Sequence, residues 1–327
     1  MAERKYSNGL WTWGKLGDRF TLDGYRQGID TIQAIAMAAT VPHLKGIEFT
    51  YPDNLNEKNW KEIKTALDDH ELTIASCYNN ISSHPRWQRG AMTASAELKR
   101  QAIAQTKACM DLVAEIGGDR ITFSLLQDGW DYPFQADYTA ARREIISGIR
   151  ECADHRPGIA IGLEYKMREP RVFCYLSNTP MTILLIKEID RPNLGVVIDV
   201  GHTLMARETM ADAIALLAEH KLLLHTHLND NWRTWDDDMI VGSVHFMETL
   251  ELMYWLRKVN YDGWYGLDIF PYREDPTRAT SESIQFMETY HEVIDRIGFD
   301  RLGELIAVGD PNETLHVIRQ AAFQVKM

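Results

Sequence analysis

The sequence predicts a single-domain (β/α)8 TIM barrel, and three observations carry that prediction. Eight short apolar runs alternate with longer stretches of helical periodicity along the chain, as in parallel strands separated by crossover helices. No G-x-G-x-x-G follows the first run, so an open dinucleotide-binding sheet lacks its main support. The length of 327 residues is ordinary for one such barrel.

The expected strands are short, nearly continuously apolar and polar at their ends, as strands buried on both faces are. They are Gly9–Trp13, Gly46–Thr50, Leu72–Cys77, Arg120–Ser124, Ile159–Tyr165, Gly195–Asp199, Leu222–Leu228 and Trp264–Phe270. Helical periodicity is clearest over Ala96–Ile116, which two glycines follow, and recurs over Met210–His220 and Phe246–Lys258. We expect the barrel over about residues 6–295 and a short helical extension over about 296–327.

Composition limits the partners. The formal net charge of −12 argues against nucleic acid or an anionic membrane, because both require a basic face. No run of about 18 apolar residues occurs, so no membrane-spanning segment is predicted. The four cysteines form no C-x-x-C pair, and we expect buried reduced thiols in a cytoplasmic protein.

Acidic and histidine side chains stand at the carboxyl ends of the last four expected strands. Glu164 ends the fifth, Asp199 the sixth, His227 the seventh and Asp268 the eighth. One acidic residue at a strand end is usually a helix cap or a loop residue, but that does not explain four at matching positions. Because neighbouring strand ends meet around a barrel mouth, we expect these groups to converge. We leave His225 out, expecting that only one histidine of this strand faces the site.

Converging carboxylates would repel one another and raise one another's pKa. A bound divalent cation removes that repulsion. Oxygen ligands together with an imidazole suit Mn2+, Mg2+ or Co2+ better than an ion that prefers thiolates. The sequence therefore predicts a divalent-metal site at the mouth of the barrel.

Several motifs resemble those of xylose isomerases. E-Y-K-M-R-E-P-R at Glu164–Arg171 is similar to the E-x-K-x-x-E-P-R stretch of that family. H-L-N-D-N…W-D-D-D over His227–Asp238 is similar to its D-L-N-x-Q…F-D-Q-D loop. G-L-W-T-W-G at residues 9–14 and S-H-P at residues 83–85 also match. The similarity is collinear over nearly the whole chain to about residue 295.

Two departures refine the resemblance. Xylose isomerases usually have Glu where Asp199 stands and Asp where His227 stands. The set Glu, Asp, His, Asp instead resembles the rhamnose isomerases of the same superfamily. That resemblance implies two cations per chain, one held by Glu164, Asp199, His227 and Asp268, the other by His202, Asp236 and Asp238 with Asp199 shared.

The same resemblance implies a metal-dependent aldose–ketose isomerase. One cation would hold two substrate oxygens while the other polarises the carbonyl, as hydrogen moves between C1 and C2. Lys166 faces the same side of its strand as Glu164 and is expected to stabilise negative charge on O1; a structural ion pair is the alternative. Asp236 is assigned with Lys166 to the catalytic group.

The residues expected to contact the sugar are Trp11, Trp13, Thr50, His84 and Glu169. Thr50 or Tyr51 stands where xylose isomerases place a ring-opening histidine, and Ser82 and Ser124 stand where they have aromatic walls. The pocket should therefore be wider and more polar than one for xylose. No basic cluster or glycine-rich anion loop indicates a phosphate, so we expect an unphosphorylated sugar.

Phe20 stands where xylose isomerases send an aromatic side chain into a neighbouring subunit. This position favours a homodimer or homotetramer, although local packing of Phe20 is the alternative.

Two other functions remain open. One is a metal-dependent ketose epimerase, or the catalytic subunit of a C-glycoside deglycosidase acting on an oxidised sugar. Epimerases of the superfamily usually end the last strand with Glu, so Asp268 weighs against them, and Asp236 with Asp238 favours two cations. The other is a non-catalytic sugar-binding or partner subunit, which retention of Lys166 and every ligand position disfavours.

Overall fold

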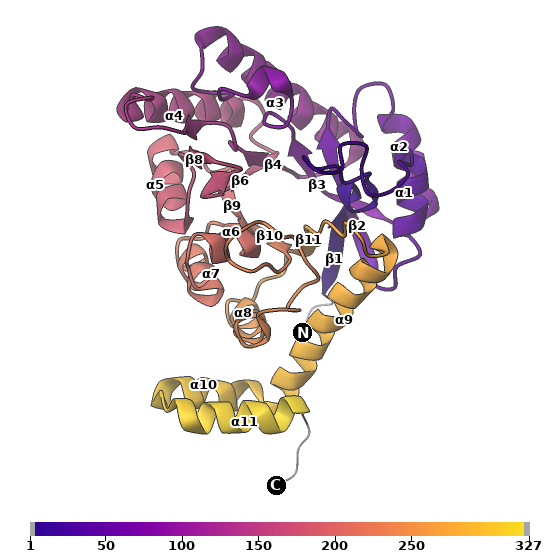
Figure 1. The fold of residues 1–327 in the computed structure, drawn as a ribbon, viewed down its shortest axis with the longest axis vertical. Coiled ribbons are helices and arrows are strands. Elements are labelled where there is room, and N and C mark those ends of the chain that lie inside the picture. Colours follow the sequence, from indigo (N-terminus) through magenta and orange to yellow (C-terminus); the bar gives the residue numbers. More distant parts are fainter. Residues whose placement is uncertain (1–3, 324–327) are drawn as a thin grey trace.

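A computed structural model describes residues 4–323. Its strands close into a parallel barrel in the spatial order β1-β11-β10-β9-β6-β4-β3-β2, with helices packed around it (Figure 1). The barrel strands are β1 (Lys5–Gly9), β2 (Leu44–Tyr51), β3 (Thr73–Asn79), β4 (Arg120–Ser124), β6 (Ala160–Glu164), β9 (Leu194–Asp199), β10 (Leu223–Leu228) and β11 (Trp264–Leu267). The predicted (β/α)8 barrel is confirmed.

The helices alternate with these strands along the chain. They are η1 (Leu10–Trp13), α1 (Thr31–Ala38), α2 (Trp60–Asp69), η2 (Pro85–Trp87), α3 (Ala96–Ile116), α4 (Tyr138–His155), α5 (Thr179–Ile189), α6 (Val200–Met205), α7 (Met210–Glu219), α8 (Phe246–Lys258), α9 (Pro276–Ile297), α10 (Phe299–Val308) and α11 (Pro311–Phe323). The last two lie side by side beyond the ring of helices and form the predicted extension (Figure 1). Residues 324–327 of that extension lie outside the described part of the chain.

Local signals explain why helix bounds were predictable. Helix α3 spans the predicted Ala96–Ile116. The Ser95 side chain accepts a hydrogen bond from Leu98 N at its start, and Gly117 at φ +98° ends it. Helix α8 likewise has the predicted bounds, and α7 differs from its prediction by one residue.

The predicted first strand, Gly9–Trp13, was wrong. The strand is Lys5–Gly9, and Leu10–Trp13 forms the 3-10 helix η1. The true strand carries Ser7 and Asn8, polar residues that are fully buried, so a search for apolar runs passes over it. Gly9, the last residue of the strand, must lack a side chain because the Trp11 ring folds over it: a Cβ on Gly9 would lie 2.0 Å from that ring.

A small antiparallel sheet supports the loop after β6. It has the order β5-β8-β7 and consists of β5 (Gly129–Trp130), β7 (Arg168–Glu169) and β8 (Val172–Cys174). This pairing fixes the segment that carries Glu169. The four cysteines are buried and free, as predicted. Within residues 4–323, no helix combines the length and hydrophobicity needed to cross a bilayer.

Candidate metal centre

A cavity of about 640 Å³ opens at the carboxyl ends of the barrel strands, where (β/α)8 enzymes carry their chemistry. Its wall includes Thr50 at the end of β2, Tyr78 near the end of β3, and the loops after β4, β10 and β11. All of the predicted site residues line it except Asp199, Trp13 and His84.

Four of the predicted ligands form one group. One candidate ligand atom from each of Glu164, Asp199, His227 and Asp268 lies within 4.8 Å of the others. His227 Nδ1 lies 2.6 Å from Glu164 Oε1 and 3.3 Å from Asp268 Oδ2. These side chains come from the ends of β6, β9, β10 and β11, so the parallel register brings together groups that are far apart in sequence.

A second group shares Asp199 with the first. Asp199, His202 and Asp236 also offer ligand atoms within 4.8 Å of one another. His202 Nδ1 lies 2.9 Å from the Tyr165 carbonyl oxygen, which can only accept, so Nδ1 carries the proton. The other ring nitrogen, His202 Nε2, is thereby left facing Asp236 Oδ2 at 3.2 Å. Asp199 also caps α6 by accepting from His202 N at 2.9 Å.

Lys166 lies between two carboxylates of the cavity wall. Its Nζ is 2.6 Å from Asp236 Oδ2 and forms a second ion pair with Glu169. Burial alone would lower the pKa of Lys166, but Asp236 and Glu169 raise it well above its ordinary value. The ammonium therefore stays charged while it faces the cavity.

The carboxylates of the two groups repel one another strongly. Burial, with Asp236 and Asp268 nearby, raises the pKa of Asp199 to about 7. Burial and the same two neighbours raise the pKa of Asp238, which lines the cavity beside them. Burial disfavours a charged His202, yet Asp199 and Asp236 raise its pKa to about 9. The two carboxylates thus favour positive charge at His202 Nε2, the same ring nitrogen that would bind a cation.

These residues fit a divalent cation. Buried Asp236 Oδ1 has no hydrogen-bond partner within residues 4–323, although an unpaired buried carboxylate oxygen costs free energy. Asn229 donates to both oxygens of Asp199, at 3.2 and 3.0 Å, and to Asp238 Oδ1 at 3.4 Å. The donors are oxygens with imidazole nitrogens, which suits Mn2+, Mg2+ or Co2+.

The structure brings three of the predicted sugar-contacting residues to the cavity and leaves two outside it. Trp11, Thr50 and Glu169 line the wall. Trp13 is 1% exposed, and its indole N–H donates to Thr277 Oγ1 of α9 at 3.2 Å, because the 3-10 turn of η1 directs it away from Trp11. The exposed His84 accepts from Arg86 N at 3.2 Å.

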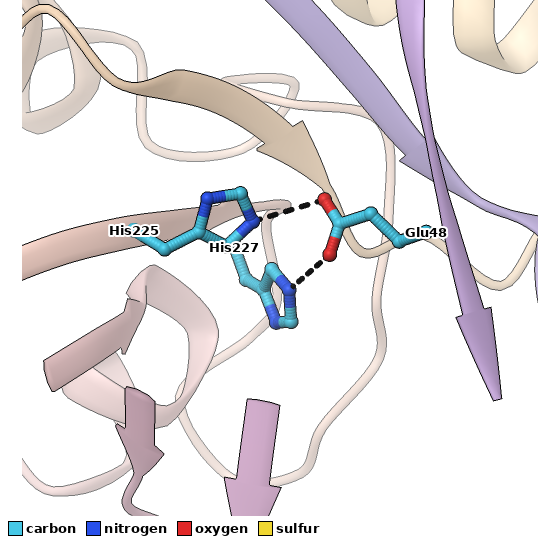
Figure 2. Close-up of side chains that lie close together, drawn as sticks. All are labelled: Glu48, His225 and His227. Atoms are coloured by element: carbon cyan, nitrogen blue, oxygen red, sulfur yellow. Dashed lines mark hydrogen bonds and ion pairs between the residues drawn. The ribbon is translucent and has the colours of Figure 1, made fainter. Parts of the chain in front are cut away.

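Sequence reasoning missed Glu48 and misjudged His225. Both His225 and His227 direct Nε2 at the carboxylate of Glu48, each at 3.0 Å (Figure 2). The premise that only one histidine of this strand can face the interior was wrong, since residues two apart on a strand share a face; His225 nevertheless belongs to neither group of predicted ligands and does not line the cavity. The available signal was a glutamate in the middle of the apolar run Gly46–Thr50, where an acid needs a buried partner.

Comparison with known proteins agrees with this architecture. Xylose isomerase of Thermus thermophilus is 24% identical over 307 residues, which cover 88% of this chain and 78% of that protein. D-allulose 3-epimerase from Methylomonas sp. has a TM-score of 0.67 at 16% identity, covering 88% of this chain and 97% of its own. 3-Keto-D-glucoside 4-epimerase from E. coli has a TM-score of 0.64 at 17% identity, covering 88% and 100%. Likeness to the solved structures shows the shared fold alone.

A family model described as xylose isomerase-like TIM barrel matches residues 32–290. The match contains β2 through β11 and therefore both groups of candidate ligands. The chain belongs to the xylose isomerase-like TIM barrel family.

Proposed function

We propose that this chain is a sugar isomerase that interconverts an aldose and a ketose with the help of two divalent cations. The observation that carries the proposal is that Asp199 belongs to both ligand groups. Two cations that share one carboxylate would be neighbours, which suits a substrate that must be held by adjacent oxygens. We assign Glu164, His227 and Asp268 to one cation, and His202, Asp236 and Asp238 to the other.

Lys166 and Asp236 are the groups to which we assign catalysis. Cations bound beside them would hold the oxygens of an open-chain sugar and stabilise negative charge there. Lys166 Nζ, charged and 2.6 Å from Asp236 Oδ2, can donate to the substrate oxygen on which charge grows. Asp236 contributes through Oδ2, which holds the Lys166 ammonium beside the substrate, while its Oδ1, without a protein partner within residues 4–323, is the oxygen left for a cation.

The cavity supports an unphosphorylated sugar. Lys166 is the only lysine or arginine in the described cavity wall, and Asp236 and Glu169 already pair with it. A phosphate would add two negative charges to a wall rich in carboxylates. Ser82 and Ser83 line the wall, and their small polar side chains leave room for a sugar larger than xylose.

An oligomer remains a prediction. Phe20 is 79% exposed on the loop after η1, which is compatible with the predicted contact to a neighbouring subunit. Sedimentation velocity at micromolar concentration tests it: a dimer or tetramer supports the prediction, and a monomer contradicts it.

The proposed function is tested with a panel of aldoses and ketoses in D2O. Protein stripped of metal and reloaded with Mn2+ should convert at least one aldose into its ketose, detected by NMR, and the stripped protein should not. Product without solvent deuterium indicates hydrogen transfer within the sugar. Absence of any aldose–ketose conversion across the panel contradicts the proposal.

An epimerase is the second candidate, because D-allulose 3-epimerase and 3-keto-D-glucoside 4-epimerase share this fold, although Asp in place of Glu at position 268 weighs against it. The D2O experiment separates the two functions. An epimerase converts one ketose into another and introduces deuterium at the inverted carbon, whereas the isomerase changes the position of the carbonyl.

A further inference from the structure

Glu48 crosses the interior of the barrel beneath the candidate metal centre. It lies on β2, whereas His225 and His227 lie on β10, and β1 and β11 stand between these strands in the barrel. Its side chain is 1% exposed. Figure 2 shows the carboxylate reaching both imidazoles, one through each oxygen. A buried carboxylate in this position is costly unless every lone pair that faces protein has a donor.

The contacts of Glu48 determine where the histidine protons are. A carboxylate only accepts hydrogen bonds, so the Nε2 atoms 3.0 Å away on His225 and His227 must both carry hydrogen. His227 Nδ1 faces the carboxylates of Glu164 and Asp268, so that nitrogen takes either hydrogen or a cation, whereas Glu48 leaves Nε2 only hydrogen. His225 Nδ1 is buried and has no partner among the described residues, as a neutral ring protonated at Nε2 would leave it.

Two further residues fit around this carboxylate. Ser7 Oγ donates to Glu48 Oε1 at 2.7 Å, so the oxygen that faces His225 is also fixed from β1. Gly266 on β11 leaves the room: a Cβ there would lie 2.6 Å from Glu48 Oε1 and 2.9 Å from His225 Nε2. Hydrogen bonds from β1 and β10 thus hold the carboxylate, and the glycine on β11 leaves space for it.

We propose that Glu48 is a positioning residue that makes His227 a metal ligand through Nδ1. By accepting from Nε2–H, it fixes the tautomer and ring orientation of His227 and increases the basicity of Nδ1, as carboxylates do behind metal-bound histidines. His225 and Ser7 occupy the other oxygen and keep the carboxylate from turning. The inference rests on the proposed metal centre and adds to it a residue that touches neither cation nor sugar.

The test compares Co2+ binding by wild-type protein, Glu48→Gln and Asp128→Asn. Loss of a residue behind a metal ligand typically weakens binding by about 10–100-fold, so Glu48→Gln should lower Co2+ affinity by about tenfold or more and change the visible absorption of bound Co2+. Asp128 is the matched control, because it is an equally buried carboxylate at 1% exposed that holds backbone amides of a loop. Asp128→Asn should keep the wild-type Co2+ affinity and spectrum.

The outcomes separate this inference from the proposed function. If wild-type protein binds Co2+ and Glu48→Gln binds it equally well with the same spectrum, the inference is overturned and the metal centre stands. If wild-type protein binds no Co2+, both are overturned. A third Co2+ per chain that Glu48→Gln loses would make Glu48 a ligand and also overturn the inference.

A measurement on wild-type protein covers the case in which Glu48→Gln does not fold. In Mg2+-loaded protein labelled with 15N-histidine, two-bond 15N–1H spectra report which ring nitrogen of each histidine carries hydrogen. We expect Nε2–H for both His225 and His227. Hydrogen on Nδ1 of His227 in the loaded protein would overturn the inference.

Discussion

The indole N–H of Trp11 donates to Asp268 Oδ1 at 2.7 Å. This hydrogen bond occupies one oxygen of the carboxylate and leaves Oδ2 facing His227 Nδ1 at 3.3 Å. The Trp11 ring also packs edge-on against the His227 ring, with centroids 6.3 Å apart. One aromatic side chain thus orients two of the candidate ligands, which explains why η1 must turn Trp11 into the cavity.

Trp11→Phe should therefore weaken metal binding while keeping the fold. The phenyl ring retains the packing, but Asp268 loses a hydrogen bond to a charged acceptor, worth about 1.5–3 kcal/mol. We expect Co2+ affinity to fall by about tenfold in calorimetric titration, while the metal-free protein still unfolds in one cooperative thermal transition. Unchanged affinity would mean that Asp268 does not need this donor.

Lys166→Met should abolish turnover without removing the cations. The substitution keeps the length of the side chain but removes the ammonium between Asp236 and Glu169. Losing one donor to a developing oxyanion costs about 100–1000-fold in kcat. Metal analysis of the purified variant should still find as much bound cation as in wild type. A variant that retains kcat would reduce Lys166 to a structural ion pair.

Adjacent aspartates offer a matched pair for the second cation. Asp236 belongs to the ligand group with Asp199 and His202, whereas the neighbouring Asp237 accepts from Trp232 N at 2.9 Å. Asp236→Asn should reduce the bound Co2+ from two ions to one per chain, and Asp237→Asn should leave two. Equal stoichiometry in the two variants would contradict the assignment of Asp236.

Site residues were predictable from the sequence where an acidic residue or a histidine stands at the end of an apolar run. Glu164, Asp199 and His227 end runs that only a buried parallel strand would have, and the barrel topology then makes them neighbours. The same logic failed for β1, since Ser7 and Asn8 are polar inside the barrel. An apolar pattern cannot reveal a strand whose buried face is hydrogen-bonded.

The rest of the site needed coordinates, because its contacts cross the barrel. Glu48 and His225 are 177 positions apart, and no local period links them. A matching motif predicts where a residue stands in the chain, but it does not predict the direction in which the side chain points. Trp13 and His84 lie within matching motifs, yet one packs against α9 and the other is exposed.

Asp128 should be a strong determinant of stability. Its carboxylate accepts from Ala91 N, Met92 N and Thr93 N, each at 2.8 Å, and so fixes the loop before α3. Asp128→Ala leaves those amides without an acceptor, and each unsatisfied buried group costs about 1–3 kcal/mol. Urea unfolding should show a loss of about 3 kcal/mol or more, and a change below about 0.5 kcal/mol, within the ordinary range of surface substitutions, would contradict this role.

His291 on α9 should make stability fall in mild acid. It is 1% exposed, and neither ring nitrogen has a partner within the described residues. Burial, with Arg4 nearby, lowers its pKa to about 4, whereas the unfolded chain has a histidine pKa of about 6.5. Between pH 6.5 and pH 4, His291 is therefore mostly protonated in the unfolded state and mostly neutral in the folded state. The free energy of unfolding is therefore unaffected by His291 above pH 6.5 and decreases as the pH falls from 6.5 towards 4.

The size of this effect follows from the two pKa values. Between pH 7 and pH 5, a histidine with these values lowers the free energy of unfolding by about 2 kcal/mol. His291→Phe preserves an aromatic ring beside Tyr265, whose centroid is 6.0 Å away, but cannot titrate. Urea unfolding of both proteins at the two pH values should therefore show a difference in pH dependence of about 2 kcal/mol. Parallel pH profiles would mean that His291 is protonated equally in the folded and unfolded chain.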